Sequence, residues 1–411
     1  MFYRKPIALT VLLFCLLLFS SNVKTYAQNT WQQRINYQIN VKLNDDIHFL
    51  NGDIRIVYHN ESEQQLSEIW MHVWPNAFKN NKSSFAKQKL EDKNTKFEYS
   101  KNSERGYMDS LQFLVNGFPV QVISNEEFPD IIKLILPTSL QPKDSIIITT
   151  PFRVKLPYTF SRIGHVEQSY QISQWYPKPA VFDQKGWHPI PYLDQGEFYA
   201  EYATYDVHIT LPQNYVVGAT GELQNQSEVQ FLDSLSTATS LMKEYSSKDT
   251  FPPSSKILKT LHYKQSNVHD FAWFADKRFH VLTSEVELPQ SKRKVKTYVM
   301  FTNKYAKYWK DASSYINDAV YYYSLWNGDY PYNYCTAVDG ALSAGGGMEY
   351  PMITVIGEVG SAKTLDRVIA HEVGHNWFYG ILGSNERVHP WMDEGVNSFY
   401  ETRYMRRKYS D

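Results

Sequence analysis

The segment Ala370–Gly380 reads AHEVGHNWFYG and lies in a stretch of helical periodicity from Leu365 to Leu382. Two histidines four residues apart, His371 and His375, lie on one face of an α-helix about one turn apart, so both imidazoles can reach a single ion. Glu372 is offset from them by about 100° around the helix axis. It can therefore approach a water molecule beside the ion without binding the ion, which is the position of a general base.

A second segment, Trp391 to Gly395 (WMDEG), opens the next helical stretch, Asp393 to Lys408. A helix-loop-helix hairpin of this length can bring Glu394 back over the histidine pair. Two nitrogen ligands and one oxygen ligand, with a fourth position left for water, form a catalytic rather than a structural zinc site. The sequence therefore predicts one Zn²⁺ per chain, with three protein ligands: His371, His375 and Glu394.

Three residues near the predicted ligands have expected supporting roles. Gly374 costs about 1 kcal/mol relative to alanine inside a helix, which is explained if a neighbouring element approaches closely behind the metal. Glu401, two turns beyond Glu394 on the same face, could hydrogen-bond a ligating histidine and set its tautomer, or could equally be a surface carboxylate. Asp393 is expected to cap its helix rather than tune the site.

Composition excludes several classes of protein. The chain has 411 residues, which is too long for one ordinary domain and indicates two or three. Hydrophobic residues make up 43% and charged residues 21%, which excludes a largely disordered chain and a multi-span membrane protein. The formal net charge of −1 excludes a binder held to nucleic acid by bulk electrostatics, so no nucleic-acid partner is expected.

The first 27 residues have the layout of a secretory signal peptide. A basic pair, Arg4-Lys5, precedes the apolar run Ile7 to Phe19, and Thr25-Tyr26-Ala27 supplies small residues for cleavage. The apolar run is too short for a comfortable permanent anchor, so no stable membrane span is expected after cleavage. The sequence predicts an exported protein, periplasmic or secreted. Cys335 is then the one remaining cysteine and is expected to be a small buried hydrophobe.

The hydrophobic period changes along the chain and predicts an α+β protein. From about Ile35 to Leu288, β-branched and aromatic residues alternate with polar ones, as in Ile54 to Tyr58, which predicts a large β-sandwich or saddle of mostly antiparallel strands over residues 28–285. From Tyr305 to Tyr323 apolar residues recur at three and four, which predicts an amphipathic helix ending at Asn327-Gly328. Residues 286–411 are therefore expected to form a mostly helical zinc domain.

An HExxH motif followed by glutamate after eighteen intervening residues resembles the gluzincin metallopeptidases. AHEVGHNWFYG and WMDEGVNSFYE look more narrowly like the M1 aminopeptidase family, which has HE-x-x-H-x-W-F-G followed by W-L-N-E-G. That family also has a Gly-x-Met-Glu-Asn loop upstream, and the matching residues here are Gly346-Gly347-Met348-Glu349-Tyr350. The resemblance implies a β-rich M1-type N-terminal domain followed by a thermolysin-like zinc domain.

The resemblance also implies how substrate would bind. Glu349 would bind the free α-amine of a peptide, because a carboxylate beside a zinc centre selects a cationic amine and fixes the register. The loop residues Gly346, Gly347 and Met348 would contact the substrate, and the run Pro351 to Ile356 could offer it a strand edge.

The sequence departs from the family pattern at two loop positions and at its end. Tyr350 replaces the loop asparagine, and Asp393 replaces the asparagine of W-L-N-E-G. The family's transition-state tyrosine lies several dozen residues beyond the third ligand, whereas this sequence ends at Asp411, so we expect a chain truncated within the catalytic domain. Tyr400, on the Glu394 helix, is poorly placed to replace that tyrosine.

Together the motifs predict zinc-dependent hydrolysis of peptide bonds. The leading hypothesis is removal of N-terminal residues from peptides with a free N-terminus, by a zinc-activated water with Glu372 as general base. One alternative is a secreted gluzincin endopeptidase, which would cleave blocked peptides. Another is a catalytically impaired, metallopeptidase-like protein whose aromatic β domain binds a peptide or glycan.

Overall fold

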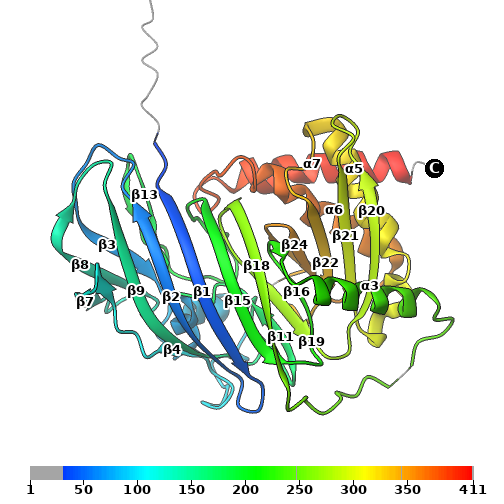
Figure 1. Cartoon of the computed structure of the whole chain (residues 1–411), viewed down its shortest axis with the longest axis horizontal. Coiled ribbons are helices and arrows are strands. Elements are labelled where there is room, and N and C mark those ends of the chain that lie inside the picture. The colour runs from blue at the N-terminus through cyan, green and yellow to red at the C-terminus, as the bar shows by residue number, and fades with distance from the viewer. Residues whose placement is uncertain (1–30, 247, 344, 410–411) are drawn as a thin grey trace, which may run out of the picture. The chain divides into compact units, whose positions relative to one another are not determined.

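The computed structural model describes residues 31–409 except 247 and 344, so the predicted signal peptide, residues 1–27, lies outside the described residues. The largest element is a nine-stranded sheet in the order β17-β18-β15-β1-β2-β9-β5-β6, with β4 paired to β9 (Figure 1). Its strands are β1 Arg34–Asn44, β2 Phe49–His59, β4 Tyr107–Asp109, β5 Leu114–Val115, β6 Phe118–Pro119, β9 Ser145–Lys155, β15 Ala203–Pro212, β17 Glu222–Leu223 and β18 Leu258–Val268.

The period-two pattern explains how this sheet folds. In β1, Ile35, Tyr37, Ile39 and Val41 are each at most 3% exposed, whereas the residues between them face outward. The pairings are antiparallel as expected, except that β1 and β15 run parallel. Parallel strands need a long crossover, and here the chain between β1 and β15 contains β2, β9 and all the strands of two of the three smaller sheets.

The smaller sheets lie between β2 and β20 in the sequence. They have the orders β10-β11-β19-β16, β12-β3-β8-β7 and β13-β14. Their strands are β3 Leu66–His72, β7 Gln121–Ser124, β8 Ile131–Leu140, β10 Gly164–Val166, β11 Ser169–Ile172, β12 Lys178–Pro179, β13 Val181–Asp183, β14 Gly186–His188, β16 Val216–Ala219 and β19 Trp273–Asp276. Three helices accompany them: η1 Trp74–Phe78, α2 Ser84–Glu91 and α3 Gln226–Ser240.

The C-terminal part contains a five-stranded sheet that the sequence analysis did not predict. Its order is β20-β21-β22-β24-β23, and β23 is one of its two edge strands. The strands are β20 His280–Glu287, β21 Lys294–Phe301, β22 Tyr334–Asp339, β23 Gly347–Tyr350 and β24 Ile353–Ile356. Cys335 is buried in β22, as expected. The sheet begins at His280, just ahead of the domain boundary expected at residue 285, and that boundary stays a prediction.

Helices gather at the C-terminal end of the chain, where α5, α6 and α7 lie close together in Figure 1. They are η2 Asn303–Tyr305, α4 Ala306–Trp309, α5 Ala312–Asn327, α6 Ala362–Phe378, the π-helical turn η3 Trp391–Gly395 and α7 Val396–Lys408. The single helix expected near residue 305 is therefore interrupted between α4 and α5, and it ends at Gly328 as predicted. None of the described helices is both long enough and apolar enough to cross a membrane.

Gly374 lies where α6 meets both neighbouring helices. A Cβ atom at this position would lie 2.1 Å from Asn397 Oδ1 on α7 and 2.3 Å from the Tyr323 ring on α5. Asn397 also donates a hydrogen bond to the His371 carbonyl at 2.7 Å, which joins α7 to α6 directly behind the motif. The close approach inferred from the sequence is therefore present.

We predict that Gly374→Ala lowers the free energy of unfolding by about 1–3 kcal/mol, the usual cost of overpacking. Helix propensity alone predicts the opposite sign, a gain of about 1 kcal/mol. Gly360→Ala is the matched control, because nothing lies within 4 Å of a Cβ atom there. Thermal unfolding of the two variants checks the prediction, and equal melting temperatures would contradict it.

Candidate metal centre

The structure brings the three predicted ligands together at the junction of α6 and η3. His371 Nε2 lies 3.1 Å from His375 Nε2 and 3.2 Å from Glu394 Oε2. The distance from His375 Nε2 to Glu394 Oε2 is 3.8 Å. Three ligands of one tetrahedral zinc ion are separated by about 3.4 Å, given bonds of about 2.0–2.1 Å. The three donor atoms therefore have the spacing of a zinc site.

The second nitrogen of each imidazole is held by a carboxylate. His371 Nδ1 lies 3.1 Å from Glu401 Oε2, and His375 Nδ1 lies 2.5 Å from Asp393 Oδ1. An ionised carboxylate only accepts, so each Nδ1 carries a proton, and each ring presents a lone pair at Nε2 once that nitrogen has lost its own proton. Two such lone pairs 3.1 Å apart repel each other unless a cation lies between them. This arrangement fits a bound divalent ion.

The role expected for Asp393 is wrong. The first turn there is π-helical rather than α-helical, and neither η3 nor α7 has a side-chain cap. Asp393 is instead fully buried and bonded to His375, whereas Glu394, the next residue, faces the Nε2 side of the same ring. Of the two roles weighed for Glu401, hydrogen bonding to a ligating histidine is the one that the geometry shows.

The surrounding carboxylates give the centre a strongly negative electrostatic potential. Burial lowers the pKa of His371, but hydrogen bonds to Glu394 and Glu401 outweigh burial and raise that pKa to about 10. Burial also lowers the pKa of His375, but the negative charge of Asp393 and the hydrogen bond to it outweigh burial and raise that pKa to about 9. The field that would protonate these rings also attracts a divalent cation, so proton and metal compete for the same lone pairs.

Glu372 is buried beside the ligands and under strand β23. A Cβ atom at Gly347 would lie 2.3 Å from Glu372 Oε1, so only glycine lets the strand pass this close. Burial raises the pKa of Glu372 to about 7, against the opposing effect of His371. Its Oε2 is buried and makes no hydrogen bond to protein. The carboxyl group can therefore take up and release a proton near neutral pH.

Glu349 is a buried acid that, like Glu372, lines the cleft and has an unpartnered oxygen. It lies on β23 and is 6% exposed, and its Oε1 makes no hydrogen bond to protein. Its ligand oxygen lies within 4.8 Å of donor atoms of His375 and Asp393. Burial and the charges of Glu197 and Glu372 raise its pKa well above the ordinary value. Such a carboxyl group is stabilised by a proton or by an incoming cation.

The sequence led us to expect a strand edge for the substrate in the run Pro351 to Ile356, and this expectation is wrong. The strand edge beside the cleft belongs to β23 instead. β24 lies between β22 and β23, so both of its edges are occupied. β23 pairs on one side only with a described strand, and its residues Gly347, Met348 and Glu349 line the cavity at the metal centre together with Gly346. All four predicted loop residues therefore lie at the cleft.

The β half closes the other side of this cleft, which has a volume of about 390 Å³. The residues that line it from that half are Arg162, Gln195 and Glu197. Arg162 Nη2 donates to both carboxylate oxygens of Glu197 at 3.0 and 3.2 Å, and Arg387 Nε donates to the Glu197 carbonyl at 2.7 Å. Sequence reasoning missed these residues, because no spacing links residues 162–197 to a motif near 371.

Tyr350, which replaces the loop asparagine, follows Glu349 in β23 and so projects from the opposite face of the strand. It is buried, and its hydroxyl donates to Gln174 Oε1 at 3.3 Å, so it joins β23 to the β half. The tyrosines of the C-terminal helix are also engaged elsewhere: Tyr404 and Tyr409 donate to Asp366 at 2.7 and 2.6 Å. Tyr400 stacks on Phe378 with ring centroids 5.1 Å apart.

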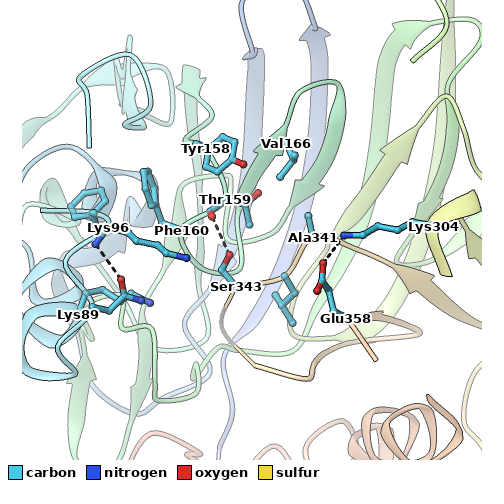
Figure 2. A pocket seen from close by; sticks show the side chains of 13 residues that line it. Lys89, Lys96, Tyr158, Thr159, Phe160, Val166, Lys304, Ala341, Ser343 and Glu358 are labelled. Atoms are coloured by element: carbon cyan, nitrogen blue, oxygen red, sulfur yellow. Dashed lines mark hydrogen bonds and ion pairs between the residues drawn. The ribbon is translucent and has the colours of Figure 1, made fainter. Parts of the chain in front are cut away.

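A larger cavity of about 560 Å³ lies beside the loop that leads to β23 (Figure 2). None of the predicted ligands lines it, and neither does Glu349 or Glu372. Two of its lysines are already paired, Lys89 with Asp194 and Lys304 with Glu358. Ser343 on its wall donates to the Thr159 carbonyl at 3.1 Å. This cavity is therefore separate from the candidate metal centre, and its wall anchors the loop before Gly346.

Comparison with known proteins supports the fold. The M1 zinc metallopeptidase of Deinococcus radiodurans is similar, with 14% identity and a TM-score of 0.57, over 93% of this chain and 72% of that one. A point mutant of the Deinococcus protein, solved with a Tyr-Ser-Ala substrate, gives 13% identity, a TM-score of 0.58 and the same coverage. No family profile and no curated protein matches significantly. This chain therefore has the fold of M1 zinc metallopeptidases.

We predict that Asp393→Asn weakens zinc binding about 10- to 100-fold, because a neutral amide makes His375 a less basic ligand than a carboxylate does. Glu401→Gln should weaken it less, since the Glu401 contact is longer and more exposed than that of Asp393. Competition with a chelator of known affinity measures both variants. If the Asp393→Asn protein binds zinc as tightly as wild type, Asp393 does not strengthen zinc binding through His375.

Proposed function

We propose that this chain is a zinc-dependent aminopeptidase of the M1 type that removes residues from the N-termini of peptides. The observation that carries the proposal is Glu349, a buried carboxylate with an unpartnered oxygen beside the complete donor set. The M1 fold supports it, and so does the Tyr-Ser-Ala substrate bound by the similar Deinococcus mutant. The predicted signal peptide supports a site of action outside the cytoplasm, periplasmic or secreted.

Zinc would be held by His371, His375 and Glu394, with Glu401 and Asp393 fixing the two imidazoles. When bound, the ion supplies Lewis-acid activation of the scissile carbonyl and of water. The chain's own contribution is to hold three donors at the right spacing, and to leave the cleft side of the centre open to a peptide.

Glu372 would carry the proton through the reaction. Its unpartnered Oε2 accepts a proton from the attacking water, and the same oxygen then donates it to the leaving amine. The raised pKa, about 7, suits both steps, because a group that titrates near the working pH gives up its proton as readily as it takes one. Strand β23 at Gly347 passes close to Oε1, whereas Oε2 is buried without a protein partner and is the oxygen proposed for this exchange.

Glu349 would set where the peptide is cut. A free ammonium group satisfies both its unpartnered Oε1 and the negative charge around it. The first carbonyl carbon is two bonds from that nitrogen, so an anchored amine brings only the first peptide bond to the metal donors. The free edge of β23 can hydrogen-bond the peptide backbone in an extended conformation.

We predict that Glu372→Gln keeps one zinc per chain but abolishes measurable hydrolysis of aminoacyl-anilides, because the amide cannot accept the proton of water. Glu358→Gln, at an exposed side chain, is the matched control and should behave as wild type. Metal analysis and initial rates on the same samples check this. Hydrolysis by Glu372→Gln at a rate near that of wild type would exclude the proposed base.

We predict that Glu349→Gln lowers kcat/KM for peptides with a free N-terminus by the equivalent of about 2–5 kcal/mol, the usual cost of leaving a buried charge unpaired. Wild type should not cleave the same peptides once they are N-acetylated, since acetylation removes the ammonium charge. A panel of free and acetylated peptides measures both effects. Equal cleavage of the two forms would favour an endopeptidase, and no turnover with zinc bound would favour a binding protein.

A further inference from the structure

Two strands of the nine-stranded sheet carry a second cluster of metal-ligating side chains. His208 on β15 and His262 on β18 are direct partners in the antiparallel register, so their side chains project from the same face. Asp206 lies two residues before His208 and shares that face. β15 and β18 lie side by side in Figure 1, in a different sheet from the one that carries Glu349.

The three side chains meet at one carboxylate oxygen. Asp206 Oδ1 lies 2.8 Å from His262 Nε2 and 3.7 Å from His208 Nδ1. The two imidazole rings are stacked, with centroids 4.0 Å apart and planes within 13°. One ligand atom from each residue lies within 4.8 Å of the others. We propose that Asp206, His208 and His262 form a second metal site, which binds a divalent transition-metal ion such as Cu²⁺ or Zn²⁺.

These three atoms lie near the spacing of ligands of one ion. Two ligands of one such ion are separated by about 3–3.4 Å, given bonds of about 2.0–2.1 Å, whereas the two contacts of Asp206 Oδ1 are 2.8 and 3.7 Å. Because an imidazole binds an ion in the plane of its ring, the two stacked rings would have to turn out of their parallel arrangement to share one. The side chains of Asp206, His208 and His262 are 29%, 40% and 25% exposed, so water can complete the coordination shell.

One charged neighbour decides which oxygen of Asp206 would face an ion. The Lys264 ammonium lies 3.2 Å from Asp206 Oδ2 and opposes a cation there, which leaves Oδ1 as the ligand.

The ligand types select the kind of ion. Two imidazoles and one carboxylate suit Cu²⁺, Zn²⁺ or Ni²⁺, whereas Mg²⁺ and Ca²⁺ prefer oxygen ligands alone. Cu²⁺ should bind most tightly, since affinity for such ligands rises from Ni²⁺ to Cu²⁺ and falls again at Zn²⁺. An ion held by both histidines would also cross-link β15 to β18. The site does not depend on the proposed hydrolysis, because it shares no residue with the metal centre.

The test starts from full-length protein already loaded with one zinc per chain, to which Cu²⁺ is added. Wild type should bind one Cu²⁺ while retaining its zinc, with an electron paramagnetic resonance spectrum of a centre with two nitrogen ligands. The double variant His208→Gln, His262→Gln should lose this signal and keep wild-type peptide hydrolysis. Thr210→Val, Thr260→Val is the matched control, because this pair spans the same two strands through a 2.8 Å hydroxyl contact.

Two single variants separate metal binding from a merely structural hydrogen bond. Asp206→Asn should weaken Cu²⁺ binding by removing the charged ligand, and Lys264→Met should strengthen it by removing the competing ammonium. Circular dichroism confirms that each variant is folded. The proposal fails if zinc-loaded wild type takes up no Cu²⁺, if the double histidine variant binds Cu²⁺ as wild type does, or if Lys264→Met leaves the affinity unchanged.

Discussion

The metal centre depends on two histidines whose outer nitrogens are both committed to carboxylates. Because Glu401 and Asp393 hold the Nδ1 protons, His371 and His375 present two lone pairs to each other at 3.1 Å. This contact is unfavourable without a cation, and every neighbouring carboxylate adds to the attraction for one. The arrangement of the side chains therefore favours a bound cation at this point. The surrounding elements serve to keep the two rings from turning away.

Close packing of the helices and of β23 prevents that rotation. Asn397 on α7 is bonded to the His371 carbonyl, and the absence of a Cβ at Gly374 allows α5 and α7 to lie directly behind the motif. On the opposite side Gly347 lets β23 touch Glu372, so this carboxyl group is held by a strand rather than surrounded by solvent. The β half then completes the wall of the cleft through Arg162 and Glu197. Precise placement of a few side chains therefore requires both halves of the chain.

Local spacing was enough to predict the donors but not their surroundings. His371, His375, Glu394 and Glu401 follow from helical periodicity, since each pair lies within one helix or one hairpin. Asp393 was assigned wrongly because an α-helical start was assumed: in the π-helical turn η3, two consecutive acids reach opposite edges of one imidazole. The strands β21 and β22, and the partnership of Arg162 with Glu197, depend on contacts between segments far apart in sequence, which no local pattern encodes.

The excess of acidic side chains around the cleft affects more than metal binding. Glu349 and Glu372 are both buried and both keep one unpartnered oxygen, although the charges of Glu197 and Glu394 disfavour their ionisation. Such an arrangement is costly in the empty cleft and becomes favourable when positive charge arrives at two points, the metal donors and Glu349. The backbone of a peptide carries positive charge only at its free amine, because internal residues carry none on the backbone. If Glu349 binds that amine as proposed, the two separate sites that favour positive charge would distinguish the end of a peptide backbone from its interior, without any contact to a particular side chain.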